Sequence, residues 1–142
     1  MKRGIQTQHH IKAPITTVWD FIKTGAQWEQ WLPILSGSQV NGNKRTCEIP
    51  TPDGGKDVME ELFLVSDIEK TFVYQVHKQA SFPAEDIVGY IRLEEKGADT
   101  ALFWSVEMNV ASEEVFNQLK GQIEHIYSES TSNLEQLATA LI

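Results

Sequence analysis

Hydrophobic and polar positions alternate with a period of two through much of the chain, which is typical of half-buried β-strands. Runs that show this alternation, or that are rich in Val, Ile, Phe, Tyr and Thr, occupy residues 3–12, 36–41, 44–49, 57–66, 70–78, 86–95 and 99–110. Turn-forming residues such as Asn41-Gly42-Asn43 and Lys96-Gly97-Ala98 separate consecutive runs. Connections this short favour antiparallel neighbours, so the pattern predicts a seven-stranded antiparallel sheet.

Three other segments carry the spacing of helices. Pro14 suits the start of a short helix, and apolar residues recur at helical spacing after it. The segment 26–32, AQWEQWL, predicts a second short helix with Trp28 and Trp31 on one side. Ser112 is the predicted N-cap of a long final helix that runs to about residue 140. The element order predicts one α+β domain over residues 1–142, with the sheet curled around the final helix.

Composition and charge narrow the possible partners. The chain has 142 residues, of which 41% are hydrophobic and 23% charged, and its net charge is −8. Lys and Arg are scattered, so there is no basic stripe for nucleic acid or for anionic membrane surfaces. No run approaches the roughly 18 apolar residues of a membrane span. We therefore expect no nucleic-acid partner, no stable membrane association and a cytoplasmic location, while the oligomeric state stays open.

Motifs for cofactors and metals are missing from the sequence. Cys47 is the only cysteine, which excludes an internal disulfide and a CxxC metal site. The four histidines do not have metal-ligand spacing, and neither a glycine-rich nucleotide loop nor a G-x-S-x-G nucleophile motif occurs. We expect no metal and no cofactor.

Several short motifs, taken in order, resemble the START-related superfamily of the SRPBCC type. They are I-K-A-P-x-x-x-V-W-D-F-I, W-x-x-W-L-P-x-x-x-x-S, M-E-E-L and F-x-Y-Q-V. The superfamily includes proteins like the birch-pollen allergen, polyketide cyclase/dehydrase-like proteins and plant abscisic-acid receptors. The resemblance covers nearly the whole chain and implies the helix-grip fold, in which sheet and final helix enclose a ligand cavity. It implies little about activity, because lipid carriers, receptors and cyclases share this fold.

Strand alternation predicts which side chains face such a cavity. The candidates on the later strands are Phe72, Tyr74, Val76, Ile87, Gly89, Ile91, Leu102 and Trp104. Leu32 and Ile34 are candidates before the second strand, and Cys47 and Ile49 are candidates within the run 44–49. Phe82 is the lid residue between two later strands. The final helix has an apolar stripe that small and polar residues interrupt, which predicts open space beside Ile126, Tyr127, Ser130, Asn133 and Leu134.

The run 57–66 has two apolar faces, so alternation alone leaves its orientation open. The resemblance places Glu60 toward the ligand, and with it Leu62. A simple hairpin register then pairs Cys47 with Glu60 and leaves Arg45 near Leu62. Glu60 would act as a polar ligand anchor, as a general acid/base, or as a structural partner of Arg45.

The leading interpretation is a carrier or sensor that binds a small hydrophobic molecule such as a lipid, polyketide or aromatic metabolite. The first alternative is a cofactor-free cyclase or dehydratase with Glu60 and Tyr74 as catalytic candidates. The second is a protein-interaction module with a filled cavity. Trp28 and Trp31 are expected to close one end of the curled sheet and to act mainly through stability.

Overall fold

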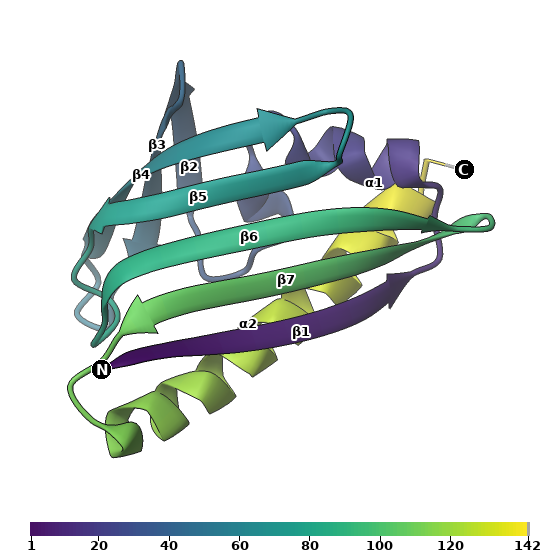
Figure 1. Cartoon of the computed structure of the whole chain (residues 1–142). Coiled ribbons are helices and arrows are strands. Elements are labelled where there is room, and N and C mark those ends of the chain that lie inside the picture. Colours follow the sequence, from purple (N-terminus) through teal and green to yellow (C-terminus); the bar gives the residue numbers. More distant parts are fainter. Residues whose placement is uncertain (142) are drawn as a thin grey trace.

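The structure is a computed structural model that describes residues 1–141, so Ile142, the last residue of the predicted 1–142 domain, lies outside the described part. A seven-stranded sheet curls over one long helix, with a short helix and a 3₁₀ turn between the first two strands (Figure 1). In chain order the elements are β1 (Lys2–Ile11), α1 (Ile15–Ile22), η1 (Trp28–Gln30), β2 (Gly37–Asn41), β3 (Lys44–Pro50), β4 (Lys56–Ser66), β5 (Thr71–Lys78), β6 (Glu85–Lys96), β7 (Asp99–Asn109) and α2 (Glu113–Thr139).

The sheet has the strand order β1-β7-β6-β5-β4-β3-β2, and every neighbouring pair is antiparallel. Consecutive strands from β2 to β7 are therefore joined as a meander, and β1 pairs with the last strand. The α+β helix-grip fold expected from the sequence is confirmed, and the predicted strands match the observed ones to within a residue or two.

Helix α2 crosses the concave face of the sheet (Figure 1). Its first turn is stabilised by the Ser112 side chain, which accepts a hydrogen bond from the Val115 N–H at 3.2 Å, and by the acidic residues Glu113 and Glu114. The helix buries a continuous stripe made of Phe116, Leu119, Ile123, Tyr127, Ser130, Thr131, Leu134 and Ala138. This stripe, rather than helix propensity alone, fixes α2 against the sheet.

The segment expected to form a second short helix is a single 3₁₀ turn whose two tryptophans are almost fully buried. The centres of their rings are 4.8 Å apart. The ring centre of Trp28 also lies 4.7 Å from that of Phe72, and the ring centre of Trp31 lies 5.9 Å from that of Trp104. The Trp28 indole N–H donates to the Ile22 carbonyl at 3.2 Å, which ties the turn to the end of α1. The pair thus fills one end of the space beneath the curled sheet.

The predicted orientation of β4 is wrong. Met59, Glu61 and Phe63 face the core, whereas Glu60 is half exposed and Leu62 points outward. On the outer face, Glu60 Oε2 lies 4.0 Å from Lys78 Nζ.

The hairpin register explains this orientation. Arg45 pairs with Glu61 and Cys47 pairs with Met59, one residue away from the predicted register. Cys47 and Ile49 are buried on the same face of β3 as Arg45, so the guanidinium is also carried inside. A buried cation needs a carboxylate nearby, and the observed register places Glu61 directly opposite Arg45, where the predicted register placed Leu62.

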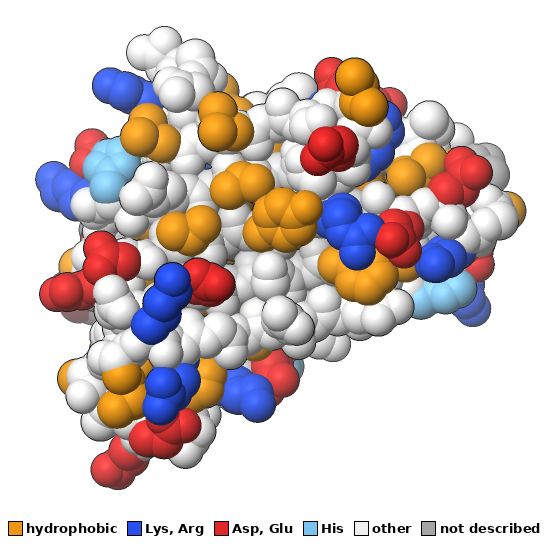
Figure 2. Space-filling view, in the orientation of Figure 1, with side chains coloured by type: hydrophobic (Ala, Val, Ile, Leu, Met, Phe, Trp, Pro, Cys, Tyr) orange, Lys and Arg blue, Asp and Glu red, His pale blue; other side chains and the backbone are white. Residues whose placement is uncertain are grey.

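The outer face of the sheet carries its own apolar group. Leu64 pairs with Val73, and Val73 pairs with Tyr90, so the three side chains form a row across β4, β5 and β6. Leu64 and Tyr90 are exposed. Figure 2 shows apolar side chains gathered over these strands, with charged side chains around them.

We expect Trp31→Ala to lower the free energy of unfolding by about 3–5 kcal/mol, because a fully buried aromatic side chain would leave a cavity. Thermal and urea unfolding followed by circular dichroism would measure the loss. Tyr90→Ala, an aromatic truncation on the outer face, is the control and should cost much less. Equal losses in the two variants would show that the tryptophan pair is not a stabilising element.

Candidate functional site

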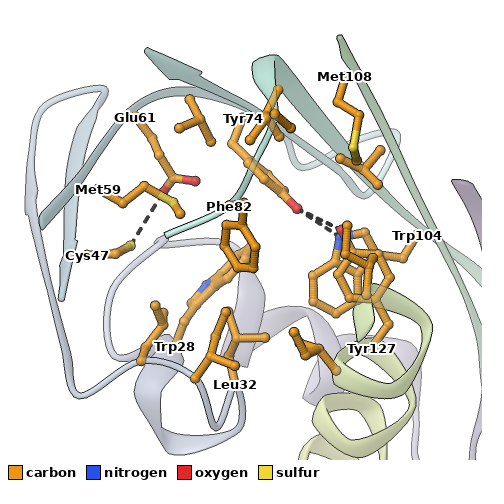
Figure 3. A pocket seen from close by; sticks show the side chains of 18 of the residues that line it. Trp28, Leu32, Cys47, Met59, Glu61, Tyr74, Phe82, Trp104, Met108 and Tyr127 are labelled. Carbon is orange, nitrogen blue, oxygen red and sulfur yellow. Dashed lines mark hydrogen bonds between the residues drawn. The ribbon is translucent and has the colours of Figure 1, made fainter. Parts of the chain in front are cut away.

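A cavity of about 90 Å³ lies between the concave face of the sheet and the first half of α2 (Figure 3). Its wall is mostly apolar and aromatic, and its lining residues are Trp28, Leu32, Ile34, Leu35, Arg45, Cys47, Met59, Glu61, Tyr74, Val76, Phe82, Ala84, Ile87, Trp104, Val106, Met108, Leu119, Ile123, Ile126 and Tyr127. An apolar chamber with a few convergent polar groups is the usual form of a small-molecule site.

One polar end of the cavity is a buried ion pair. The Arg45 Nε donates to Glu61 Oε1 at 2.7 Å, and both side chains are about 2–3% exposed. The Arg45 Nη1 donates to the Gly25 carbonyl at 3.2 Å, in the loop after α1. Figure 3 shows the Glu61 carboxylate projecting from β4 between Met59 and Tyr74.

Aromatic rings surround the Arg45 guanidinium. Its Cζ lies 4.0 Å from the centre of the Trp28 ring, and the rings of Phe72, Tyr74 and Phe63 are 5.2, 5.7 and 5.9 Å away. A cation over an aromatic face is stabilised by the ring quadrupole, more strongly where water is excluded. Trp28, which closes one end of the fold, therefore also holds in place the cationic group of the cavity wall, Arg45.

Cys47 belongs to the same end of the cavity. Its thiol donates to Glu61 Oε1 at 3.4 Å. Burial, and next the nearby Glu61 charge, raise the pKa of the Cys47 thiol to about 12. The thiol therefore stays protonated near neutral pH and is a poor nucleophile.

A second polar group consists of two tyrosines and a tryptophan. The Trp104 indole N–H donates to the Tyr74 hydroxyl at 3.0 Å, and the Tyr74 and Tyr127 hydroxyls are 3.4 Å apart. The rings of Trp104 and Tyr127 stack at 3.7 Å, which joins β7 to α2. Burial raises the pKa of Tyr74 and raises that of Tyr127 well above its ordinary value, so both phenols remain neutral.

Gly89 makes room for this cluster. A Cβ atom built on Gly89 would lie 1.9 Å from Cζ of Tyr74 and 2.3 Å from its hydroxyl oxygen. Gly89 also pairs directly with Tyr74 across β5 and β6. The phenol can therefore lie against the bare backbone of β6 instead of filling the cavity.

The loop between β5 and β6 covers part of the cavity with Phe82, which is half-buried. The Gln79 side chain donates to the carbonyls of Phe82 and Ala84 and accepts from the Phe82 N–H. Asp57 of β4 accepts from the Ala80 N–H and from the Ser81 hydroxyl, and these bonds lower the pKa of Asp57. The loop is thus held closed by a small set of polar contacts.

Many of the residues singled out from the sequence lie on the cavity wall. They are Leu32, Ile34, Cys47, Tyr74, Val76, Phe82, Ile87, Trp104, Ile126 and Tyr127. Their contact with a ligand remains a prediction.

The other candidates lie elsewhere. Glu60 and Leu62 point away from the cavity because of the β4 register. Deeper core positions, which do not line the cavity, are taken by Ile49, Phe72, Ile91, Leu102 and Leu134, and Gly89 lies beneath Tyr74.

The small and polar residues of α2 do not open a space in the helix stripe. The Ser130 hydroxyl donates to the Ile126 carbonyl at 2.6 Å and is fully buried. The Asn133 side chain donates to the Trp31 carbonyl at 3.3 Å. The cavity lies beside the preceding turns of the helix, where the wall residues are Leu119, Ile123, Ile126 and Tyr127. Ser130, Asn133 and Leu134 do not line it.

Several wall residues were not predicted from the sequence, and the two most important are Arg45 and Glu61. Arg45 shares the strand face of Cys47 and Ile49, and that alternation indicates an inward guanidinium. An inward Arg45 in turn requires an inward carboxylate on β4, which Glu60 or Glu61 could supply, and the observed register places Glu61 directly opposite Arg45. Val106 and Met108 follow Trp104 at strand spacing and were similarly available from periodicity.

Within residues 1–141, no cluster of three or more His, Cys, Asp or Glu side chains is arranged to hold a metal ion. The described helices also include none with the length and apolarity needed to cross a membrane.

The family model for "Polyketide cyclase / dehydrase and lipid transport" matches residues 2–141. The chain belongs to this family. No curated protein matches the sequence.

Solved structures share the fold at low sequence identity. XoxI from Bacillus cereus is 23% identical with a TM-score of 0.80, and the alignment covers 97% of this chain and 96% of that protein. The Zhui aromatase/cyclase from Streptomyces sp. R1128 is 11% identical with a TM-score of 0.79, covering 98% and 94%. A START superfamily protein from Mycobacterium smegmatis is 12% identical with a TM-score of 0.82, covering 98% and 99%. These likenesses, with the family match, confirm the START-related assignment.

Gly89→Ala should destabilise the fold by about 1–3 kcal/mol, because the added methyl group must displace the Tyr74 ring. Urea unfolding of Gly89→Ala, Tyr74→Ala and the double variant would test this. In the Tyr74→Ala background the glycine substitution should cost little. Gly121→Ala, at an open position of α2, is the control and should be neutral or slightly stabilising. Additive losses in the double variant would contradict the packing argument.

Cys47 should not react with a disulfide reagent such as DTNB at about pH 8 while the protein is folded, since its thiol is buried and its pKa is raised. The single thiol should react fully in guanidinium chloride. Ser128→Cys, on the exposed side of α2, should add one thiol that reacts in the native state. Rapid labelling of Cys47 in the native protein would mean that the cavity opens widely on that timescale.

Proposed function

We propose that this protein binds a small hydrophobic ligand in the cavity between the sheet and α2, as a carrier or a sensor. The observation that carries the proposal is an apolar, aromatic chamber with a buried ion pair on its wall. Burying two charges beside empty space is costly for a domain that only needs a packed core. A ligand that forms hydrogen bonds with these two charged side chains offsets that cost.

The size of the cavity limits the ligand. Pockets that enclose drug-sized molecules measure about 300–1,000 Å³, and a cavity of about 150 Å³ holds benzene. At about 90 Å³, the chamber takes one aromatic ring only after a modest movement of its wall. Met59 and Met108 have flexible thioether side chains, and Phe82 lies on a loop held by a few polar contacts, so these three residues are the ones expected to move.

An enzyme of the cyclase or dehydratase type is the second candidate. The Tyr74 and Tyr127 hydroxyls share one hydrogen bond, which leaves one neutral O–H donor on the same cavity wall as the Glu61 carboxylate. A polarised carbonyl group next to a base is what enolisation needs. In this candidate Glu61, not Glu60, is the base. Mass spectrometry of a bound polyketone before and after incubation would distinguish turnover from simple binding.

Fluorobenzene should bind in the cavity and give a saturable change in its ¹⁹F NMR shift. Ala84→Leu adds three carbons to the cavity wall and should abolish binding while leaving the protein folded. Ala98→Leu, in the exposed turn between β6 and β7, is the matched control and should bind normally. An unchanged fluorobenzene signal with the folded wild-type protein would refute the proposed function.

A further inference from the structure

Arg45 and Glu61 are joined by one hydrogen bond and do not form the two parallel hydrogen bonds of a bidentate pair. Arg45 uses Nε on Glu61 Oε1 and Nη1 on the Gly25 carbonyl, and the Cys47 thiol also donates to Oε1. Within the part of the chain that the structure describes, Glu61 Oε2 and Arg45 Nη2 have no hydrogen-bond partner. One donor and one acceptor of the pair are therefore left over.

Both leftover atoms face open space. Among the described residues, the one fully buried side-chain polar atom that lacks a partner is Trp31 Nε1, so neither Nη2 nor Oε2 is sealed off. Arg45 and Glu61 are almost entirely shielded from the exterior, and the open space that both side chains line is the cavity. The cavity wall thus presents one unused donor and one unused acceptor that belong to the same ion pair.

The charge balance of the wall decides which polar group fits there. Among residues 1–141, Arg45 and Glu61 are the only charged residues that line the wall, so this lining has no net charge. A ligand carboxylate can accept from Arg45, but its second oxygen would meet the Glu61 carboxylate, and like charges in a poorly hydrated site repel strongly. A carboxamide, an alcohol or a phenol donates to Oε2 and accepts from Nη2 at the same time.

We propose that Arg45 and Glu61 select neutral ligands whose polar end both donates and accepts a hydrogen bond, and that they exclude carboxylates and other anions. The inference rests on the proposed function, because it assigns the ligand class of the same cavity. The ligand is then a small hydrophobic molecule ending in a hydroxyl or carboxamide group, rather than a fatty acid anion.

An isosteric pair of probes tests the selection. 4-Fluorobenzamide and 4-fluorobenzoate have the same shape, and ¹⁹F NMR titration of each gives its affinity. The wild-type protein should prefer the amide by at least about tenfold, the scale of one hydrogen bond to a charged group. Because any apolar cavity disfavours an anion, the decisive readouts come from variants.

Glu61→Gln places a second donor beside Arg45 Nη2 and leaves the wall with a net positive charge. This variant should gain 4-fluorobenzoate binding and lose amide binding, each by about tenfold, so that the preference reverses. Glu60→Gln changes the net charge of the protein equally but lies on the outer face, with its side chain 44% exposed. It should keep the wild-type preference.

A double variant keeps the test decisive if Glu61→Gln, which leaves a buried arginine unpaired, does not fold. Arg45→Met with Glu61→Leu removes both charges, a replacement that buried ion pairs often tolerate. It should still bind fluorobenzene but bind 4-fluorobenzamide about tenfold more weakly than the wild type. An unchanged amide affinity in the double variant, or an unchanged preference in folded Glu61→Gln, overturns the inference.

Fluorobenzene separates this inference from the proposed function. If the wild-type protein binds fluorobenzene but shows no preference for the amide, the cavity binds ligands and the selection by Arg45 and Glu61 is wrong. If fluorobenzene itself does not bind, the proposed function fails, and the inference fails with it.

Discussion

The buried contact between Arg45 and Glu61 is the constraint on which the concave side of this molecule depends. Arg45 Nε lies 2.7 Å from Glu61 Oε1, and both side chains are almost fully buried. Separating two such charges inside a protein is expensive, so any register of β3 against β4 that parted them would be strongly disfavoured. The pair therefore sets which face of β4 turns inward, and with it the positions of Met59 and Phe63.

The same contact links the fold to the site. Trp28 packs against the Arg45 guanidinium and against Phe72, so the turn that closes the end of the sheet also supports the polar end of the cavity. On the other side, the stacked rings of Trp104 and Tyr127 hold α2 at the sheet, and Gly89 lets Tyr74 lie flat against β6. The cavity is thus the space left between two aromatic clusters that are each locked by polar contacts. A site built on strands and helices in this way is held more rigidly than one built on loops.

The family of this chain combines cyclase/dehydrase and lipid-transport proteins in one fold, so chemistry at the cavity wall has to distinguish its members. Here the wall carries an ion pair with no net charge and two neutral phenols. The proposed preference for neutral molecules with a hydroxyl or amide group over anions rests on this wall. The small volume favours a short ligand, or a wall that adapts through Phe82 and the methionines.

The sequence by itself determined the fold class, the strand order along the chain and the inward faces of β5, β6 and β7. Those strands alternate apolar and polar residues clearly, and a period of two fixes the face of every residue once one is known. It also placed Tyr74, Trp104 and Tyr127 on the inner side of the molecule. A local pattern is sufficient to predict which face of an element is buried wherever only one of its faces is apolar.

Tertiary structure decided the rest. Both faces of β4 are apolar, so its orientation came from a long-range pairing with Arg45, which alternation within β4 does not contain. The space beside α2 likewise depended on packing: Ser130 bonds to its own helix and is buried, while the cavity opens along the stretch from Leu119 to Tyr127. A cavity is the volume that several packed elements together leave empty, so its size and position cannot be predicted from any single segment of the sequence.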